Sequence, residues 1–407
     1  MGVGSERFDA APSGQGDRPM KTETTRRDVL KGGLAMAGLG VVGLPEWAYP
    51  ALAQDETLVP FTDLPEQIVL RRTPDRRIID VRYIDGFFTP IDEFFTTQHY
   101  GHPDIDTDSY RLRISGLVDE PLALSLDDLR AMPSRELVFG FECSGNRGPL
   151  NGLSSNGRWT GVPLRAVLER AGVQDRAREF VFLGADHGEE EVVFRGRTYT
   201  VDQQYGRSLP RDRALSDEPL LAYALGGEPL TPFQGRPLRL LVPGWYGAPN
   251  VKYLSEIHVQ EDQYLGKYQA RWYRTLKGKM VNGELKWKET AITRMRLKSY
   301  IARVTERGGS HNVFGVIMHD GTPIRSVEVK VDDGDWQPAT LDPATTGERY
   351  SWKFFNYTWE GATAGEHTVT SRATDESGYV QPTAEELEVK QTFLEHNAQH
   401  PRTVMIG

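Results

Sequence analysis

A single cysteine, Cys143, in a chain of 407 residues is the feature that most restricts the possible folds and sites. One thiol cannot close an intramolecular disulfide, and it cannot supply the ligands of a cysteine-rich zinc site or an iron–sulfur cluster. Covalent attachment of a c-type haem is excluded as well, because it needs a C-x-x-C-H sequence. Core packing must therefore hold the fold, and Cys143 needs another explanation.

The composition is that of a folded chain with more than one domain. Hydrophobic residues make up 38% of the chain and aromatic residues 10%, which argues against disorder. The length exceeds what a single ordinary core holds. The 57 acidic and 48 basic side chains give a net charge of −9, which disfavours a nucleic-acid partner because phosphates need a basic face.

The first 53 residues have the pattern of an export signal. Arg26 and Arg27 precede the uncharged apolar run 32–43, and Ala51-Leu52-Ala53 offers a cleavage site. The run is too short to span a bilayer, so we predict a twin-arginine signal peptide. No later segment is long and apolar enough to span a membrane, and the mature protein is therefore predicted to be soluble and periplasmic.

The mature chain begins with a pattern typical of an α+β domain. Ser125 is expected to cap a short helix at 126–132, and a second helix is predicted at 163–171. Strands are predicted around these helices at 110–114, 136–142, 180–183, 191–194, 237–242 and 257–259. Because the helices are few and short, a mixed sheet fits better than a doubly wound one.

After Ser299 the pattern becomes all-β. Turn signals at 320–323 and 332–335 are closely spaced, and valines alternate at 327, 329 and 331. These features predict an immunoglobulin-like sandwich. The predicted organisation is a signal peptide, an irregular N-terminal arm, a catalytic domain, a basic aromatic crossover, the sandwich domain and a tail, at residues 1–53, 54–100, 101–265, 266–298, 299–395 and 396–407.

The crossover has two interpretations. Residues 260–300 carry ten Lys or Arg against four Asp or Glu, with tyrosines and tryptophans interleaved. The stretch is either a solvated connection wrapped on the first domain or a basic rim that steers an anion or an acidic partner.

Cys143 follows a predicted strand and stands in a loop of small polar residues, Ser144-Gly145-Asn146-Arg147. A buried structural cysteine is the alternative, but such a residue rarely lies beside glycine and arginine. We expect Arg147 to lower the thiol pKa. Two functional hypotheses remain: a nucleophile with a histidine base, for which His99, His102 and His187 are available, or a ligand to a soft metal whose other ligands come from an organic cofactor.

Seven segments, in the same order, resemble the sulfite oxidase family of molybdopterin-dependent oxidoreductases. The loop 141–147 resembles its molybdenum-binding loop, and 239–254 resembles its pterin-binding run. The remaining similarities, including one to the family's dimerisation domain, lie at 94–99, 158–164, 205–210, 220–227 and 373–382.

The resemblance implies a molybdopterin-binding α+β domain followed by an immunoglobulin-like dimerisation domain. It makes Cys143 the molybdenum ligand, and it places Tyr223 near the metal as a catalytic residue. The residues implied to hold the cofactor, besides Cys143, are His99, Asn146, Arg147, Ser208 and Lys252. The family's chemistry would be oxidation of sulfite to sulfate by oxygen-atom transfer, with electrons passed to an external c-type cytochrome, because no haem domain is recognisable in this chain.

Two departures from the family pattern bear on the substrate. Thr97 and Pro249 stand where the family has arginine, and anionic sulfite favours guanidinium partners. Arg158, Arg207, Arg236 and Arg325 are candidates to compensate. Oxidation of another sulfur compound, or reduction of an S-oxide or N-oxide, is therefore an alternative. Different-class alternatives are a cofactor-free cysteine hydrolase or thiol transferase and a non-catalytic binding module.

Overall fold

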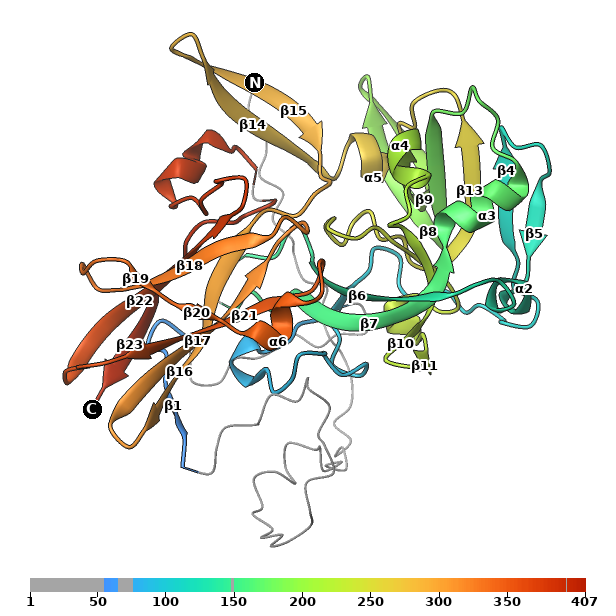
Figure 1. Cartoon of the computed structure of the whole chain (residues 1–407). Coiled ribbons are helices and arrows are strands. Elements are labelled where there is room, and N and C mark those ends of the chain that lie inside the picture. Colours follow the sequence, from blue (N-terminus) through green and yellow to red (C-terminus); the bar gives the residue numbers. More distant parts are fainter. Residues whose placement is uncertain (1–54, 65–75, 148–149, 393) are drawn as a thin grey trace, which may run out of the picture. The chain divides into compact units, whose positions relative to one another are not determined.

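The computed structural model describes residues 55–64, 76–147, 150–392 and 394–407 (Figure 1). The predicted signal peptide, residues 1–53, lies outside the described residues. Within the described part, no helix is long and apolar enough to cross a membrane.

The first five-stranded sheet is mixed, as the sequence predicted. Strand β13 pairs in parallel with β4 and antiparallel with β8, in the order β5-β4-β13-β8-β9. The two strands predicted at 180–183 and 191–194 are one long strand, because the pairing of β8 with β9 shifts register between Leu183 and His187 and then resumes. The strands are β4 (Leu112–Gly116), β5 (Leu122–Leu124), β8 (Glu179–Phe194), β9 (Arg197–Pro210) and β13 (Leu254–Gln260).

The second sheet carries the cysteine loop. Its order is β11-β10-β7-β6, with β12 pairing β10, and Cys143 directly follows the last residue of β6. The residues of β6 from Leu137 to Glu142 are all buried, so the loop leaves from a fixed point in the core. The strands are β6 (Arg135–Glu142), β7 (Ser154–Pro163), β10 (Leu220–Leu225), β11 (Glu228–Pro229) and β12 (Arg239–Leu241).

The helices are short, as predicted. Ser125 and Asp128 form a reciprocal capping box at the start of α2, and α3 buries the apolar residues Leu164, Val167 and Leu168. The helices are α2 (Leu126–Arg130), α3 (Leu164–Ala171), α4 (Arg211–Ala214), α5 (Lys267–Ala270) and α6 (Pro343–Thr346), and the 3-10 helices are η1 (Val81–Tyr83), η2 (Pro232–Gln234) and η3 (Glu385–Val389).

The C-terminal part consists of two antiparallel sheets, in the orders β1-β16-β17-β21-β20 and β19-β18-β22-β23, which share a core that includes Ile301, Val329 and Phe355. Two edge strands come from segments that were expected to lie outside the sandwich domain: β1 from the irregular arm and β23 from the tail. Their short sequences carry little periodicity, and pairing with β16 and β22 makes them strands. The strands are β1 (Thr57–Val59), β16 (Lys298–Arg307), β17 (Ser310–Met318), β18 (Ile324–Val331), β19 (Gln337–Pro338), β20 (Thr340–Leu341), β21 (Lys353–Trp359), β22 (Gly365–Asp375) and β23 (Arg402–Ile406).

The segment expected as a crossover contains a β-hairpin, β14 (Arg274–Val281) and β15 (Glu284–Ala291), which Figure 1 shows as a two-stranded ribbon. Asn282 and Gly283 form its turn with φ angles of 52° and 81°, the backbone that Asn-Gly favours in a two-residue hairpin loop. A further short pair joins β2 (Arg76–Arg77) to β3 (Thr96–Thr97).

A buried ion pair joins the first strand of the C-terminal part to the cysteine loop. Lys298 Nζ lies 2.9 Å from Glu142 Oε2 and donates to the Asn146 carbonyl oxygen at 3.0 Å. The two side chains are 3% and 1% exposed. Because buried charges need full compensation, this contact fixes the residue before Cys143.

Replacing Lys298 with methionine leaves Glu142 buried without its partner. We expect Lys298→Met to lower the free energy of unfolding by about 3–5 kcal/mol in urea denaturation. The matched control, Arg307→Met, removes the exposed pair of Arg307 with Asp55 and should change it by less than about 1 kcal/mol. Equal losses in both variants would contradict a structural role for the buried pair.

Candidate functional site

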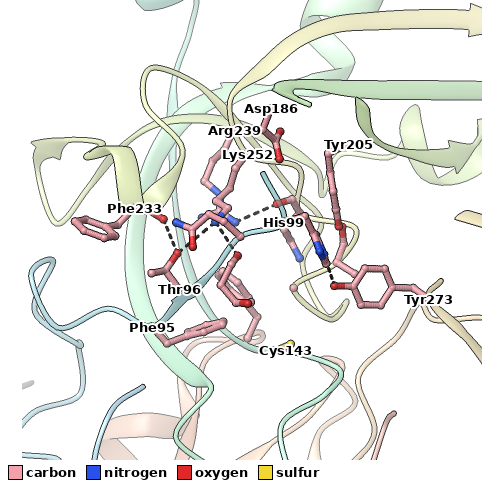
Figure 2. A pocket seen from close by; sticks show the side chains of 16 residues that line it. Phe95, Thr96, His99, Cys143, Asp186, Tyr205, Phe233, Arg239, Lys252 and Tyr273 are labelled. Carbon is pink, nitrogen blue, oxygen red and sulfur yellow. Dashed lines mark hydrogen bonds between the residues drawn. The ribbon is translucent and has the colours of Figure 1, made fainter. Parts of the chain in front are cut away.

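A pocket of about 610 Å³, counting the open solvent at its mouth, lies beside the cysteine loop. Figure 2 shows the Cys143 sulfur at one end and Asp186, Arg239 and Lys252 at the other. The lining residues are Phe95, Thr96, Thr97, Gln98, His99, Phe141, Cys143, Asp186, Tyr205, Phe233, Arg239, Gly247, Ala248, Asn250, Lys252 and Tyr273.

The main chain holds Cys143 from both sides of the loop. Its N–H donates to the Leu153 carbonyl at 2.9 Å, and its carbonyl accepts the Asn146 N–H at 2.8 Å. Gly247 donates its N–H to the Glu142 carbonyl at 2.7 Å, and a Cβ at Gly247 would lie 3.7 Å from Cys143 Cα. The thiol therefore presents to the pocket from a backbone with little freedom.

The thiol pKa is raised, contrary to the expectation for Arg147. Burial raises the pKa of Cys143, and the nearby charges of Arg76 and Lys252 only partly oppose this effect. Arg147 is exposed. The thiol pKa is therefore not lowered as predicted, because the effect of burial outweighs that of the positive charges near Cys143.

His99 lies against tyrosines on one side of the pocket. Its Nε2 and the Tyr273 hydroxyl are hydrogen-bonded at 2.8 Å, and its ring centroid lies 4.6 Å from that of Tyr268 and 5.4 Å from that of Tyr205. The exposed part of the imidazole faces the pocket that it lines. Burial, followed by the charges of Lys252 and Lys267, lowers the pKa of His99 to about 4, so the ring is neutral at neutral pH.

The far end of the pocket is cationic. Lys252 Nζ donates to the Thr97 carbonyl oxygen at 2.9 Å, and the buried Arg239 donates to the carbonyl oxygens of Gln234 and Asn250 at 3.0 and 3.1 Å. Burial lowers the pKa of Arg239 to about 9, which still leaves it charged at neutral pH. Burial also raises the pKa of the neighbouring Asp186 carboxyl.

The structure brings together three of the residues singled out from the sequence: Cys143, His99 and Lys252 all line the pocket. Asn146 and Ser208 are buried in internal contacts instead. The Asn146 amide donates to Glu142 Oε2 and accepts the Leu153 N–H, and Ser208 donates to Glu179 Oε1. Among the described residues, the pocket walls include neither of these side chains nor that of Arg147.

Tyr223 also lies outside the pocket walls. It stands on β10 at a register shift between Ala222 and Ala224, and Arg130 lies over its ring at 5.8 Å. The phenols that face the pocket are Tyr205 and Tyr273, neither of which the sequence analysis selected. Tyr273 belongs to the aromatic stretch noted at 260–300, and that stretch was the available signal for it.

Arg239 and Asp186 were also missed as pocket residues. Arg239 is the first residue of the pterin-binding run quoted from the sequence, so the motif contained it. Asp186 stands at the register shift of β8, which the sequence pattern does not reveal. None of the four arginines proposed to compensate for Thr97 and Pro249 lines the pocket, whereas Thr97 itself does.

Comparisons with known proteins agree with this geometry. Residues 99–268 match the family described as the oxidoreductase molybdopterin binding domain. Mitochondrial sulfite oxidase of Rattus norvegicus is 30% identical over 328 residues, which cover 73% of this chain and 58% of the rat protein. Sulfite oxidase of Gallus gallus is 31% identical over 325 residues, which cover 73% of this chain and 69% of the chicken protein.

The chain belongs to the sulfite oxidase family. It is a molybdenum oxidoreductase with Mo-molybdopterin as cofactor. A nitrate reductase [NADH] of Phaseolus vulgaris is 29% identical over 338 residues, 73% of this chain and 37% of that protein. The chain spans less than three fifths of the length of the mammalian sulfite oxidases.

A solved structure shares the fold of this family member. The crystal structure of the sulfane dehydrogenase SoxCD from Paracoccus pantotrophus superposes with a TM-score of 0.67 at 24% identity. The match covers 86% of this chain and 91% of that chain. It shows the arrangement of the chain and carries no statement about the substrate.

The residues present fit the cofactor of the family. The thiol of Cys143 at one end is a soft donor of the kind that molybdenum takes, and Lys252 and Arg239 at the other end suit a phosphate. Gln98 Oε1, Asp186 Oδ1 and Arg239 Nε are buried pocket atoms that lack a hydrogen-bond partner within the described residues. Such atoms indicate a polar ligand that satisfies them.

The protein itself offers only a partial metal site. Across the described residues, no three His, Cys, Asp or Glu side chains are grouped to hold a metal ion. An organic cofactor that brings its own ligands is therefore the arrangement that uses a single thiol. A cysteine hydrolase would need an imidazole bonded to the thiol, and the His99 Nε2 contact is with Tyr273 instead.

The charges around His99 lead to a titration test. In cofactor-free protein, we expect the His99 ring to protonate with a midpoint at about pH 4, and Lys252→Met to raise this midpoint because it removes a nearby positive charge. Histidine NMR titration measures both values. His367, whose pKa is raised by its hydrogen bond to Asp332, serves as the reference in the same spectra. A His99 midpoint near pH 6.5 that is the same in wild type and in Lys252→Met would contradict a buried imidazole beside a lysine charge.

Proposed function

We propose that this protein is a periplasmic sulfite dehydrogenase that oxidises sulfite to sulfate and passes electrons to an external c-type cytochrome. The observation that carries the proposal is the polarity of the pocket, with one thiol at one end and Lys252 and Arg239 at the other. The named relatives with sulfite oxidase activity are 30–31% identical, which supports the same chemistry.

The overall reaction balances as sulfite plus water giving sulfate, two protons and two electrons. Bound Mo-molybdopterin supplies the oxygen-atom transfer and the two-electron redox change. The chain holds the thiol of Cys143 on a backbone that is hydrogen-bonded on both sides of the residue. His99 and Tyr273 share a hydrogen bond at the pocket wall, so a proton at this position can be held between imidazole and phenol.

A related sulfur compound is the second candidate substrate, and the lining near Cys143 favours it. This side of the pocket presents a neutral imidazole and two phenols, and Thr97 stands where the family has arginine. Arg239 donates from both of its terminal nitrogens to main-chain carbonyls, so fewer of its N–H groups are available to a substrate. A substrate with less negative charge than sulfite would lose less binding free energy from the absence of this guanidinium.

The location and assembly are part of the proposal. The paired arginines and the apolar run within residues 1–53 support twin-arginine export to the periplasm. The two antiparallel sheets of the C-terminal part, with their shared core, support an immunoglobulin-like sandwich. The resemblance of residues 373–382 to the family's dimerisation domain supports a homodimer.

A steady-state assay with sulfite and ferricyanide tests the reaction. The proposal expects two ferricyanide reduced for each sulfate formed. Turnover of a sulfane or S-oxide without turnover of sulfite would replace the proposed substrate with the second candidate.

Restoring the missing guanidinium tests the role of Thr97. The Thr97 carbonyl, rather than its side chain, accepts Lys252, so this contact survives substitution. We expect Thr97→Arg to lower the KM for sulfite about tenfold, since a charge-assisted hydrogen bond contributes about 1.5 kcal/mol. Thr97→Lys adds the charge without the planar fork and should give a smaller gain. An unchanged or higher KM in Thr97→Arg would argue against sulfite binding at this wall.

A further inference from the structure

The β14–β15 hairpin places lysines of the two strands directly opposite one another. The register pairs Lys277 with Lys288 and Lys279 with Lys286, so four lysines lie on one face of a two-stranded ribbon. Like charges directly opposite each other destabilise a β pair, and an isolated hairpin is marginal in water. A ribbon of this kind gains stability when an acidic surface covers the lysines.

Only part of this charge is balanced within the chain. Lys277 lies 3.4 Å from the buried Glu395, and Lys286 pairs with Glu284 on the same strand. Among the described residues, Lys279 and Lys288 form no ion pair, and both are exposed. Two exposed lysines, one on each strand, are thus left for a partner.

The opposite face of the ribbon is apolar and exposed toward the turn, whereas Arg274 and Glu289 form an ion pair on this face nearer the base. Met280 is paired with Leu285, and the neighbouring Trp287 is opposite Gly278. Their exposed fractions are 61%, 40% and 38% for Met280, Leu285 and Trp287. Clustered exposed apolar side chains, with tryptophan and methionine among them, are typical of protein interfaces.

The root of the hairpin is at the pocket. Tyr273, the residue before β14, lines the pocket and is hydrogen-bonded to His99. At the same end of the ribbon, Ile292 follows β15 and donates its N–H to the Tyr273 carbonyl at 2.9 Å, and the Ile292 carbonyl accepts the buried Arg207 side chain. A protein bound along the ribbon is therefore attached next to the redox site.

We infer that the β14–β15 hairpin is the docking surface for an acidic electron-accepting protein. This inference rests on the proposed function, which requires an external acceptor. The chain as a whole carries a charge of −9, so the lysine face is a local exception that orients an acidic partner toward it. An anionic membrane fits less well, because the lysines and the apolar side chains lie on opposite faces of the ribbon.

Charge reversal at the two unpaired lysines tests the surface. The variant is Lys279→Glu/Lys288→Glu, and the control is Arg307→Glu/Arg325→Glu, which makes the same charge change at exposed sites outside the hairpin. Titration calorimetry with an oxidised acidic cytochrome c measures binding without turnover. Binding should weaken at least tenfold in the hairpin variant and remain close to wild type in the control.

Steady-state kinetics then separate docking from chemistry. The hairpin variant should show a raised KM for the acidic cytochrome with a weaker salt dependence, while its rate with ferricyanide and its KM for sulfite stay unchanged. Trp287→Ser should raise the same KM through the apolar face. No sulfite turnover in wild type with ferricyanide would defeat the proposed function, and the calorimetry would still decide the docking surface.

Three results would overturn the inference. The first is equal cytochrome binding in wild type and the hairpin variant. The second is a change from dimer to monomer in the hairpin variant by sedimentation, which would make a second copy the occupant. The third is loss of binding to vesicles containing phosphatidylglycerol with cytochrome binding unaltered, which would make the hairpin a membrane contact.

Discussion

The buried ion pair between Lys298 and Glu142 is the contact on which the geometry of the redox site depends. Each charge is buried, and the pair gains further hydrogen bonds because the Asn146 amide donates to Glu142 Oε2 and Lys298 donates to the Asn146 carbonyl. The C-terminal segment adds a second hold, since the Glu395 N–H donates to the Ser144 carbonyl at 2.7 Å. Cys143 lies between these two attachments. The C-terminal part therefore positions the thiol as well as completing the fold.

This anchoring gives the pocket its polarity. The thiol is fixed at one end, the cations Lys252 and Arg239 stand at the other, and His99 lies between them against tyrosine rings. Because burial and two lysines keep His99 neutral, the wall near the thiol carries hydrogen-bonding groups without net positive charge. The thiol and the two cations at the ends of the pocket suit the cofactor, whereas the wall between them offers little positive charge to an anionic substrate.

Several residues of the site were predictable because they belong to short sequence motifs that resemble those of the family. The lone thiol, His99 and Lys252 were chosen from such motifs and line the pocket. Tyr223 was chosen in the same way but lies on β10 at a bulge, and strand register, which sequence does not fix, decides where a side chain points. Asp186 was not predicted because it also stands at a register shift, in β8. The Asn282-Gly283 turn was a readable hairpin signal that was overlooked, while β1 and β23 depend on partners distant in sequence.

The single thiol of Cys143 is expected to hold the metal at one end of this pocket. X-ray absorption at the molybdenum edge of purified, cofactor-loaded protein measures the sulfur ligands directly. We expect the wild-type spectrum to contain the dithiolene sulfurs and one further thiolate, and we expect Cys143→Ser to remove that thiolate while the cofactor stays bound. An identical sulfur contribution in both proteins, or purified wild-type protein without molybdenum despite cofactor supply, would contradict this role of Cys143.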